Sequence, residues 1–211
     1  MESLPLFPLG TVLLPGVRFP LRVFEPRYVA MVRHLESTTA REFGVVAIRR
    51  GHEVGSHIPE LYRIGCAAVL KNVTRAEGHL VIEAACSRRF RIESVDEGGA
   101  PYLVASVEWL DLQAEDVAVE ATNGARRAFE SFSRAVGAHV QGLPQDPGRL
   151  TASVLDGLGL PLPERQKVLE AGDATARLRA VTRLCHREEG LAEVLHCRAA
   201  TVTPSSRLSP N

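Results

Sequence analysis

The 211-residue chain lacks the features of a membrane-anchored or exported protein. It has no run of about 20 apolar residues, the length that a membrane-spanning helix needs. A secretory signal places basic residues before an unbroken apolar helix. Here the apolar segment 4–16 contains three helix-breaking prolines, and Glu2 is the only charged residue before Arg18. We therefore expect a cytoplasmic protein with neither a signal peptide nor a membrane anchor.

Motifs of the common enzyme classes and metal sites are also missing. The sequence holds no GxxxxGK[ST], GxGxxG, GxSxG or HExxH. Only Lys71 and Lys167 are lysines, and neither lies in a serine-proximal motif of a Ser-Lys dyad. The cysteines form no CxxC pair, so we expect reduced thiols; they are Cys66, Cys86, Cys185 and Cys197. These absences predict a non-enzymatic protein with no catalytic residues, metal or cofactor.

An excess of charge of either sign is absent as well. Lys+Arg and Asp+Glu both number 25, and they balance at 13 each in residues 1–112 and 12 each in 113–211. Neither half therefore offers a broad cationic surface to nucleic acid or anionic lipid. Local arginine clusters at 88–91, 49–50 and 126–127 allow phosphate binding. A solvated face of mixed charge is the favoured interpretation of the cluster Arg88, Arg89 and Arg91, because Glu83, Glu93, Asp96 and Glu97 lie nearby in the sequence.

Residues 1–112 carry the pattern of short strands. Residues 17–24 alternate apolar and polar side chains, and Pro20, which has no N–H, predicts an edge strand or a bulge there. Segment 4–16 predicts two short strands with turns at Gly10 and Pro15-Gly16. Further strands are expected over 43–49, 61–74, 80–92 and 103–109, and one helix over 26–37. Six or seven strands with one inserted helix predict a closed or partly closed β-barrel.

The strand expected over 80–92 places six side chains on one face: Leu80, Ile82, Ala84, Cys86, Phe90 and Ile92. Arg88 falls in the same inward register, which predicts a bulge or bend near 86–88.

Residues 113–200 switch to helical periodicity and predict a small helical bundle. We expect a helix over roughly 115–140, with one face formed by Phe129, Phe132, Val136 and Val140. Asp146 and Pro147 start a second helix, Pro163 starts a short third one, and Asp173 caps the last. The last helix carries Leu178, Val181, Leu184, Leu191 and Leu195 on one face. The Pro/Ser-rich segment 201–211 is expected to be disordered.

Two groups of residues could form local sites. In Phe24-Glu25-Pro26-Arg27-Tyr28, the arginine can pair with the carboxylate or stack on the tyrosine. A structural lock between strand and helix is favoured there over direct ligand contact. Cys185-His186 and His196-Cys197, with Glu193, suggest a metal site, but eleven helical residues separate the two pairs by about 16 Å. Core thiols and surface histidines are therefore favoured.

The ordered series LPLFPLGTVLLPG, FPLRVFEPRY, FGVVAIRRGHEVG, LYRIGCAAV, RRFRI and PYLVASVEWL resembles the Lon protease N-terminal (substrate-binding) domain family. The resemblance is closest to its free-standing bacterial members, which lack the ATPase and protease domains, and it covers roughly 4–198. It implies a PUA-like β-barrel over 1–112, an α-helical bundle over 113–200, and recognition of unfolded or tagged protein substrates. Cys86 departs from the glycine expected before the RRFRI strand.

The leading hypothesis is a non-enzymatic module that binds unfolded or extended polypeptides and acts with an ATP-dependent protease. No membrane or nucleic-acid partner is expected. A barrel edge at Pro20 would accept an extended segment. The residues expected to contact the bound polypeptide are Phe19, Phe24, Glu25, Arg27 and Tyr28. An RNA-binding PUA-like module is the alternative, and an enzyme whose site is assembled from distant residues is the third.

Overall fold

A computed structural model describes residues 2–51, 59–96, 98–110 and 117–195. These residues form two compact units, called here the strand unit (up to residue 110) and the helical unit (from residue 117). The predicted domain boundary at 112/113 and the tail predicted over 201–211 lie outside the described residues. The division of the chain into two domains therefore stays a prediction.

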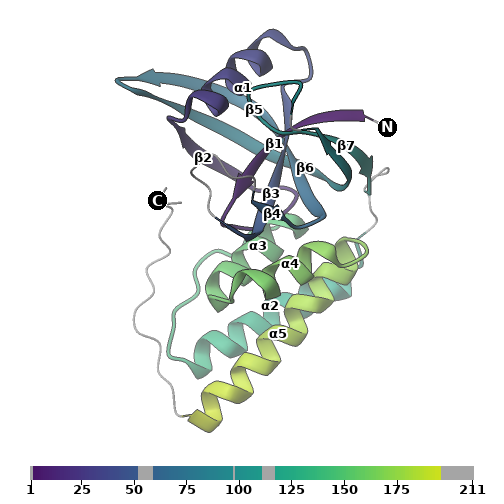
Figure 1. The fold of residues 1–211 in the computed structure, drawn as a ribbon. Coiled ribbons are helices and arrows are strands. Elements are labelled where there is room, and N and C mark those ends of the chain that lie inside the picture. The colour runs from purple at the N-terminus through teal and green to yellow at the C-terminus, as the bar shows by residue number, and fades with distance from the viewer. Residues whose placement is uncertain (1, 52–58, 97, 111–116, 196–211) are drawn as a thin grey trace. The chain divides into compact units, whose positions relative to one another are not determined.

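The described part of the strand unit contains seven strands and one helix. The strands are β1 (Glu2–Leu9), β2 (Arg18–Val23), β3 (Glu42–Arg50), β4 (Glu60–Leu61), β5 (Ile64–Ala76), β6 (His79–Asp96) and β7 (Val104–Trp109), and the helix is α1 (Pro26–Ser37). The hydrogen-bonded order β1-β7-β6-β5-β3 is closed by a parallel pairing of β1 with β3. Five strands thus form a ring, from which the long β5–β6 hairpin extends (Figure 1).

β2 lies at an edge of the sheet, as Pro20 predicts. Within the described residues it pairs with β6 alone, in an unbroken antiparallel register from Arg18↔Ala85 to Val23↔Leu80. The side chains alternate along the strand: Phe19, Leu21 and Val23 are buried, and Arg18, Pro20 and Arg22 are exposed. The half-buried strand predicted from the period of two is confirmed.

The helix that follows β2 is also confirmed. α1 begins at Pro26, a residue suited to a first helical turn because its missing N–H would have no helical partner. The predicted apolar stripe is its buried face: Tyr28, Met31, Val32 and Leu35. These side chains join a core cluster with Phe7, Phe19 and Phe43. The helix therefore covers apolar side chains contributed by β1, β2 and β3.

A bulge in β6 changes the face on which its side chains lie. Ala68 pairs with Cys86, but Cys66 pairs with Arg89, so β6 has one residue more than β5 between these pairs. One extra residue inverts the alternation. Ile82, Ala84 and Cys86 consequently join the cluster with α1, whereas Phe90 and Ile92 join a second cluster with Leu4 and Leu6. The bulge predicted near 86–88 is confirmed, and the prediction of a single face for residues 80–92 is wrong.

Cys86 itself has an ordinary backbone. Among the described non-glycine residues, Arg41 alone has a positive φ, at 48°. The Cys86 side chain is buried in the cluster with α1. The position therefore requires no glycine, and the bulge is formed by the residues that follow it.

The helical unit contains four helices in its described part: α2 (Val119–Ala135), α3 (Pro147–Leu158), α4 (Leu162–Glu170) and α5 (Ala174–Leu195). α2, α3 and α4 each contact α5. Both predicted aspartate caps are present. The Asp146 carboxylate accepts a hydrogen bond from the Arg149 N–H (2.8 Å), and the Asp173 carboxylate accepts one from the Ala176 N–H (2.6 Å).

Three sequence predictions differ from the structure. Residues 11–17 form no strand, although Val12, Leu13 and Leu14 are buried, so this segment contributes packing without strand pairing. α2 ends at Ala135, because Gly137 turns the chain with φ 73°, and its buried face is Ala121, Ala125, Ala128, Phe129 and Ser133. On α5, Leu178 and Val181 are buried, but Leu191 and Leu195 are exposed.

Candidate functional site

The β2 edge, the side of β2 that faces away from β6, is the first candidate site. The Cys86 N–H donates to the Val17 carbonyl (2.8 Å), so the carbonyl of residue 17 points toward β6. Backbone direction alternates along an antiparallel pair. The odd-numbered residues of β2 therefore face β6, and its even-numbered residues face away: Arg18, Pro20 and Arg22. In the described part of the chain, no strand pairs with these outward groups.

The strand–helix junction, residues 24–28, continues from the β2 edge. The Phe24 side chain is 51% exposed. The Arg27 guanidinium lies 2.9 Å from the Glu25 carboxylate and 4.7 Å from the centroid of the Tyr28 ring. Tyr28 stacks in turn on Phe7, with the ring centroids 4.1 Å apart. Arg27 thus both pairs and stacks, which fixes the first turn of α1 against the core.

Burial limits which of the five predicted contact residues a client could reach. Phe19 and Tyr28 are only 3% and 5% exposed, because both side chains belong to the core cluster with α1. Neither can offer apolar surface to a partner in this structure. Phe24 can, and Glu25 and Arg27 are partly exposed but paired with each other. A role of these residues in binding stays a prediction.

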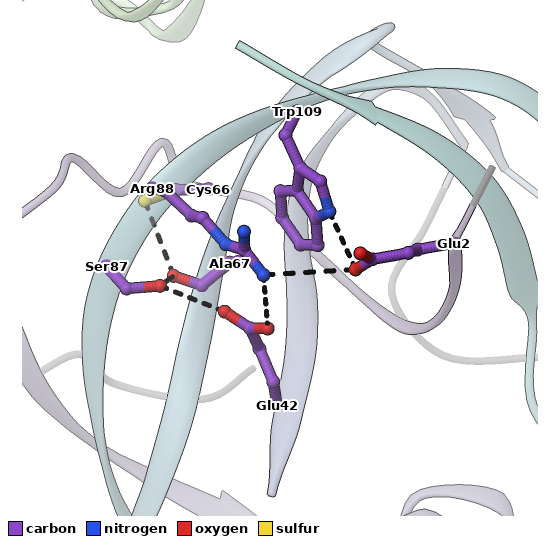
Figure 2. Close-up of polar contacts among 7 residues, drawn as sticks. All are labelled: Glu2, Glu42, Cys66, Ala67, Ser87, Arg88 and Trp109. Atoms are coloured by element: carbon purple, nitrogen blue, oxygen red, sulfur yellow. Dashed lines mark hydrogen bonds and ion pairs between the residues drawn. The ribbon is translucent and has the colours of Figure 1, made fainter. Parts of the chain in front are cut away.

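A second group of polar residues, the Arg88 cluster, surrounds the bulge of β6. It comprises Glu2 on β1, Glu42 on β3, Arg88 on β6 and Trp109 on β7 (Figure 2). The Arg88 guanidinium lies 3.5 Å from the Trp109 ring centroid and 3.1 Å from the Glu42 carboxylate. Glu2 accepts a hydrogen bond from the Trp109 indole N–H at 2.7 Å and lies 3.9 Å from Arg88.

The Arg88 cluster connects four strands of the ring. Ser87, in the bulge beside Arg88, donates hydrogen bonds to the Glu42 carboxylate (3.2 Å) and to the Ala67 carbonyl (3.3 Å; Figure 2). A guanidinium paired with a carboxylate and stacked on an indole has little capacity left for a phosphate. The cluster is therefore a structural joint. Sequence reasoning missed Glu2, Glu42 and Trp109 because the joint unites residues from four distant segments.

Four of the six remaining arginines of the predicted clusters are engaged or buried too, whereas Arg50 and Arg127 are exposed. Arg91 pairs with Glu108 at 2.5 Å, and Arg89 is 2% exposed. Arg49 pairs with Glu60 at 3.1 Å. Arg126 donates to the carbonyls of Leu143 and Pro144. The face of mixed charge is confirmed in kind, but its carboxylates are Glu2, Glu42 and Glu108 rather than the predicted sequence neighbours.

Cysteine and histidine side chains form no metal site in the described residues, where no group of three or more potential ligands occurs. His196 and Cys197 lie outside that part of the chain. Cys185 is fully buried, and this desolvation, with the nearby Glu189 carboxylate, raises its pKa to about 12. The thiol is therefore protonated at neutral pH. Burial also raises the pKa of the Tyr102 hydroxyl.

The fold agrees with the comparisons to known families. The sequence profile of the ATP-dependent protease La (LON) substrate-binding domain matches residues 3–187, which is far more than half of the chain. The chain belongs to the LON substrate-binding domain family. The matched range includes the described strands of the strand unit except the first residue of β1, and it extends into α5 of the helical unit.

Relatives of this LON substrate-binding domain protein are named Lon proteases. The chain is 27% identical over 203 residues to Lon protease of Anaeromyxobacter dehalogenans, an alignment that covers 90% of this chain and 24% of the relative. It is 30% identical over 198 residues to Lon protease of Phenylobacterium zucineum, with 86% and 24% covered. The chain thus spans about a quarter of the length of these curated relatives.

Solved structures of Lon N-terminal domains share the fold. A Lon N-terminal domain protein from Xanthomonas campestris superposes with a TM-score of 0.62 at 26% identity, covering 87% of this chain and 98% of the other. The N-terminal domain of a Mycobacterium avium complex Lon protease gives 0.61 at 16% identity, covering 88% and 98%. The chain therefore has the Lon N-terminal domain fold, a mixed sheet with five helices in its described residues. Among those residues, no helix is long and apolar enough to cross a membrane.

Proposed function

We propose that this protein is a non-enzymatic, cytoplasmic module that binds unfolded or extended polypeptides and presents them to an ATP-dependent protease as an adaptor. The observation that carries the proposal is the β2 edge, which pairs with no strand of the described residues and runs into the exposed Phe24. Membership of a family named for substrate binding supports the same function. An unpaired edge can accept an extended chain as an additional strand.

The geometry of the edge favours weak and sequence-tolerant binding. Main-chain hydrogen bonds are the same for every client sequence, so they supply affinity without much selection. Pro20 has no N–H, so one of the three outward-facing residues of β2 cannot donate. Fewer main-chain bonds weaken the added strand and make its release easier. A recognition module that passes clients on requires this reversibility.

Binding of an unfolded protein tests the proposal directly. The probe is fluorescein-labelled ribonuclease A that has been reduced and carbamidomethylated, and native ribonuclease A is the control for foldedness. Fluorescence anisotropy should rise as this protein is added to the unfolded probe and stay flat for the native one. If the unfolded probe fails to bind the correctly folded protein at any accessible concentration, the proposed polypeptide binding is wrong.

Substitution of Phe24 locates the binding to this surface. Phe24→Ser removes an apolar side chain that is 51% exposed, and Leu191→Ser removes one on α5 that is 48% exposed. Half of a phenylalanine contributes roughly 1 kcal/mol on burial, so we expect Phe24→Ser to weaken binding about fivefold. Leu191→Ser should leave the affinity unchanged. Equal effects of the two substitutions would show that the site lies elsewhere.

The adaptor role needs a separate assay. A Lon-type protease from the same host should degrade the unfolded probe faster when this adaptor is present. Phe24→Ser in the adaptor should reduce this stimulation. Cross-linking and affinity capture from that host, with and without nuclease treatment, would identify the protease and distinguish protein clients from RNA. If this protein instead slows degradation by sequestering the probe, the adaptor role is contradicted.

The proposal also concerns the division of the chain into two domains. We propose that the ring of strands is a PUA-like barrel over 1–112 and that 113–200 forms a separate helical bundle. Expression of residues 1–112 alone tests this division. A cooperative unfolding transition reported by Trp109, the single tryptophan, is expected for that fragment.

A further inference from the structure

The outward face of β2 carries two arginines that have no carboxylate partner among the described residues. Arg18 and Arg22 are exposed, and neither makes an ion pair with any described residue. This sets them apart from Arg27, Arg88 and Arg91, each of which lies within 3.1 Å of a carboxylate. Two unpaired positive charges of the strand unit are thus placed along the same short strand that offers an unpaired edge.

From this juxtaposition we infer that the β2 edge selects extended segments with two acidic side chains four residues apart. The inference rests on the proposed polypeptide binding and specifies the class of client. In an antiparallel added strand, the residues directly opposite Arg18 and Arg22 are four apart, and their side chains lie on the same face as the two guanidinium groups. Opposite charges in such cross-strand positions stabilise the pairing.

The carboxylate that β6 places opposite the middle of β2 does not compete with the client. Glu83 lies on β6 directly opposite Pro20, on the other side of β2 from the free edge. Neighbouring strands are about 4.8 Å apart, so a client strand lies one strand spacing from the arginines and two from Glu83. Acidic client side chains are therefore closer to the two positive charges than to the negative one.

The backbone of the edge sets the register of the client. Arg18 and Arg22 each direct an N–H and a C=O outward, and Pro20 between them directs only a C=O. The two complete donor–acceptor pairs therefore coincide with the two positive charges. A client gains most when its acidic residues are also the residues whose own N–H and C=O groups face β2. Charge and main-chain pairing thus favour the same register.

Labelled nine-residue peptides test the inference by fluorescence anisotropy at low salt. One peptide has glutamate at two positions four apart, and two others have glutamine or lysine there. We expect the glutamate peptide to bind about tenfold more tightly than the glutamine peptide and the lysine peptide to bind most weakly. The preference should shrink as salt is added. Equal affinities of the glutamate and glutamine peptides would overturn the inference.

Charge reversal on the protein assigns the preference to β2. Arg18→Glu/Arg22→Glu should invert the order, so that the lysine peptide binds best. Arg33→Glu/Arg63→Glu is the matched control, since both arginines are exposed, belong to the same unit and form no ion pair with described residues. If the control variant changes the order equally, the preference comes from the net charge of the protein and the inference fails.

N-methylation of the glutamate peptide tests strand addition itself. Methyl groups on the two glutamate N–H groups block the hydrogen bonds to β2 and should abolish binding, whereas methyl groups on the residues next to each glutamate should leave it. The same loss for both methylated peptides would refute strand addition. If unfolded ribonuclease binds but the glutamate, glutamine and lysine peptides bind with equal affinity, the inference fails while the proposed function stands. If single-stranded RNA competes with the peptide and loses binding in Arg18→Glu/Arg22→Glu, the arginines bind phosphates instead.

Discussion

Two buried glycines that border Phe90 provide a sharp test of the packing in the strand unit. Gly44 lies on β3 and Gly65 on β5, and the Phe90 ring occupies the space beside both. A Cβ at Gly44 would lie 2.6 Å from Phe90 Cζ and 2.9 Å from Leu4 Cδ2. A Cβ at Gly65 would lie 2.6 Å from Phe90 Cζ and 2.5 Å from the Val45 carbonyl oxygen. Side chains alone obstruct the first position, but backbone obstructs the second.

Alanine at the two positions should therefore have different and separable costs. Overpacking a core costs about 1–3 kcal/mol, and we expect Gly44→Ala to fall in this range. Gly65→Ala should lie at or above the upper end, since the Val45 carbonyl belongs to the pairing of β3 with β5 and cannot rotate away. Phe90→Leu shortens the obstructing side chain. It should rescue Gly44→Ala by about 1 kcal/mol in a double-mutant cycle and leave most of the Gly65→Ala cost in place.

Urea unfolding followed by the fluorescence of Trp109 measures these free energies. Trp109 is the single tryptophan of the chain and contacts Phe90 edge to face, with ring centroids 6.3 Å apart, so it reports on the strand unit. The comparison requires equal slopes of free energy against urea for all variants. A Gly65→Ala protein more stable than Gly44→Ala, or one fully rescued by Phe90→Leu, would refute the assigned packing.

Three further predictions concern other parts of the protein. Arg88→Met keeps the aliphatic stem but removes the ion pair with Glu42 and the contact with Trp109, so it should cost about 1–2 kcal/mol, and a cycle with Glu42→Gln should give a coupling of about 0.5–1 kcal/mol; additive effects would contradict the joint. The pKa of the Cys185 thiol is raised to about 12 in the folded protein, whereas an unfolded thiol has a pKa of about 8.5–9. Between these pH values the folded thiol keeps its proton and the unfolded thiol has lost it. The free energy of unfolding should therefore fall as pH rises through about 9–12. Cys185→Ala should lack this part of the decline, by about 1.4 kcal/mol at one pH unit above the unfolded pKa, and identical pH profiles would exclude the assignment. Asp146→Ala removes the cap of α3 and should destabilise the helical unit by about 1 kcal/mol in far-ultraviolet circular dichroism, whereas Asp146→Asn should be nearly neutral.

Local patterns in the sequence determined much of the strand unit. The alternation in β2, the edge position of Pro20, the start and buried face of α1 and the bulge of β6 were all predictable, because each depends on residues that are neighbours in the chain. The ordered motifs also identified the family. The apolar segment 11–14 misled the strand assignment, since burial of its side chains does not require pairing of its backbone.

The sites depended on contacts that no local pattern contains. Phe19 and Tyr28 looked like contact residues, but the core cluster with α1 buries both, and this leaves Phe24 as the accessible aromatic side chain of the five predicted residues. The sequence by itself determined most of the strands and helices, together with the family, because periodicity and capping act over a few residues. Only the tertiary structure decided that Arg88 is bound by carboxylates from distant strands whereas Arg18 and Arg22 are not. Which charges remain available to a partner depends on how the strands are brought together.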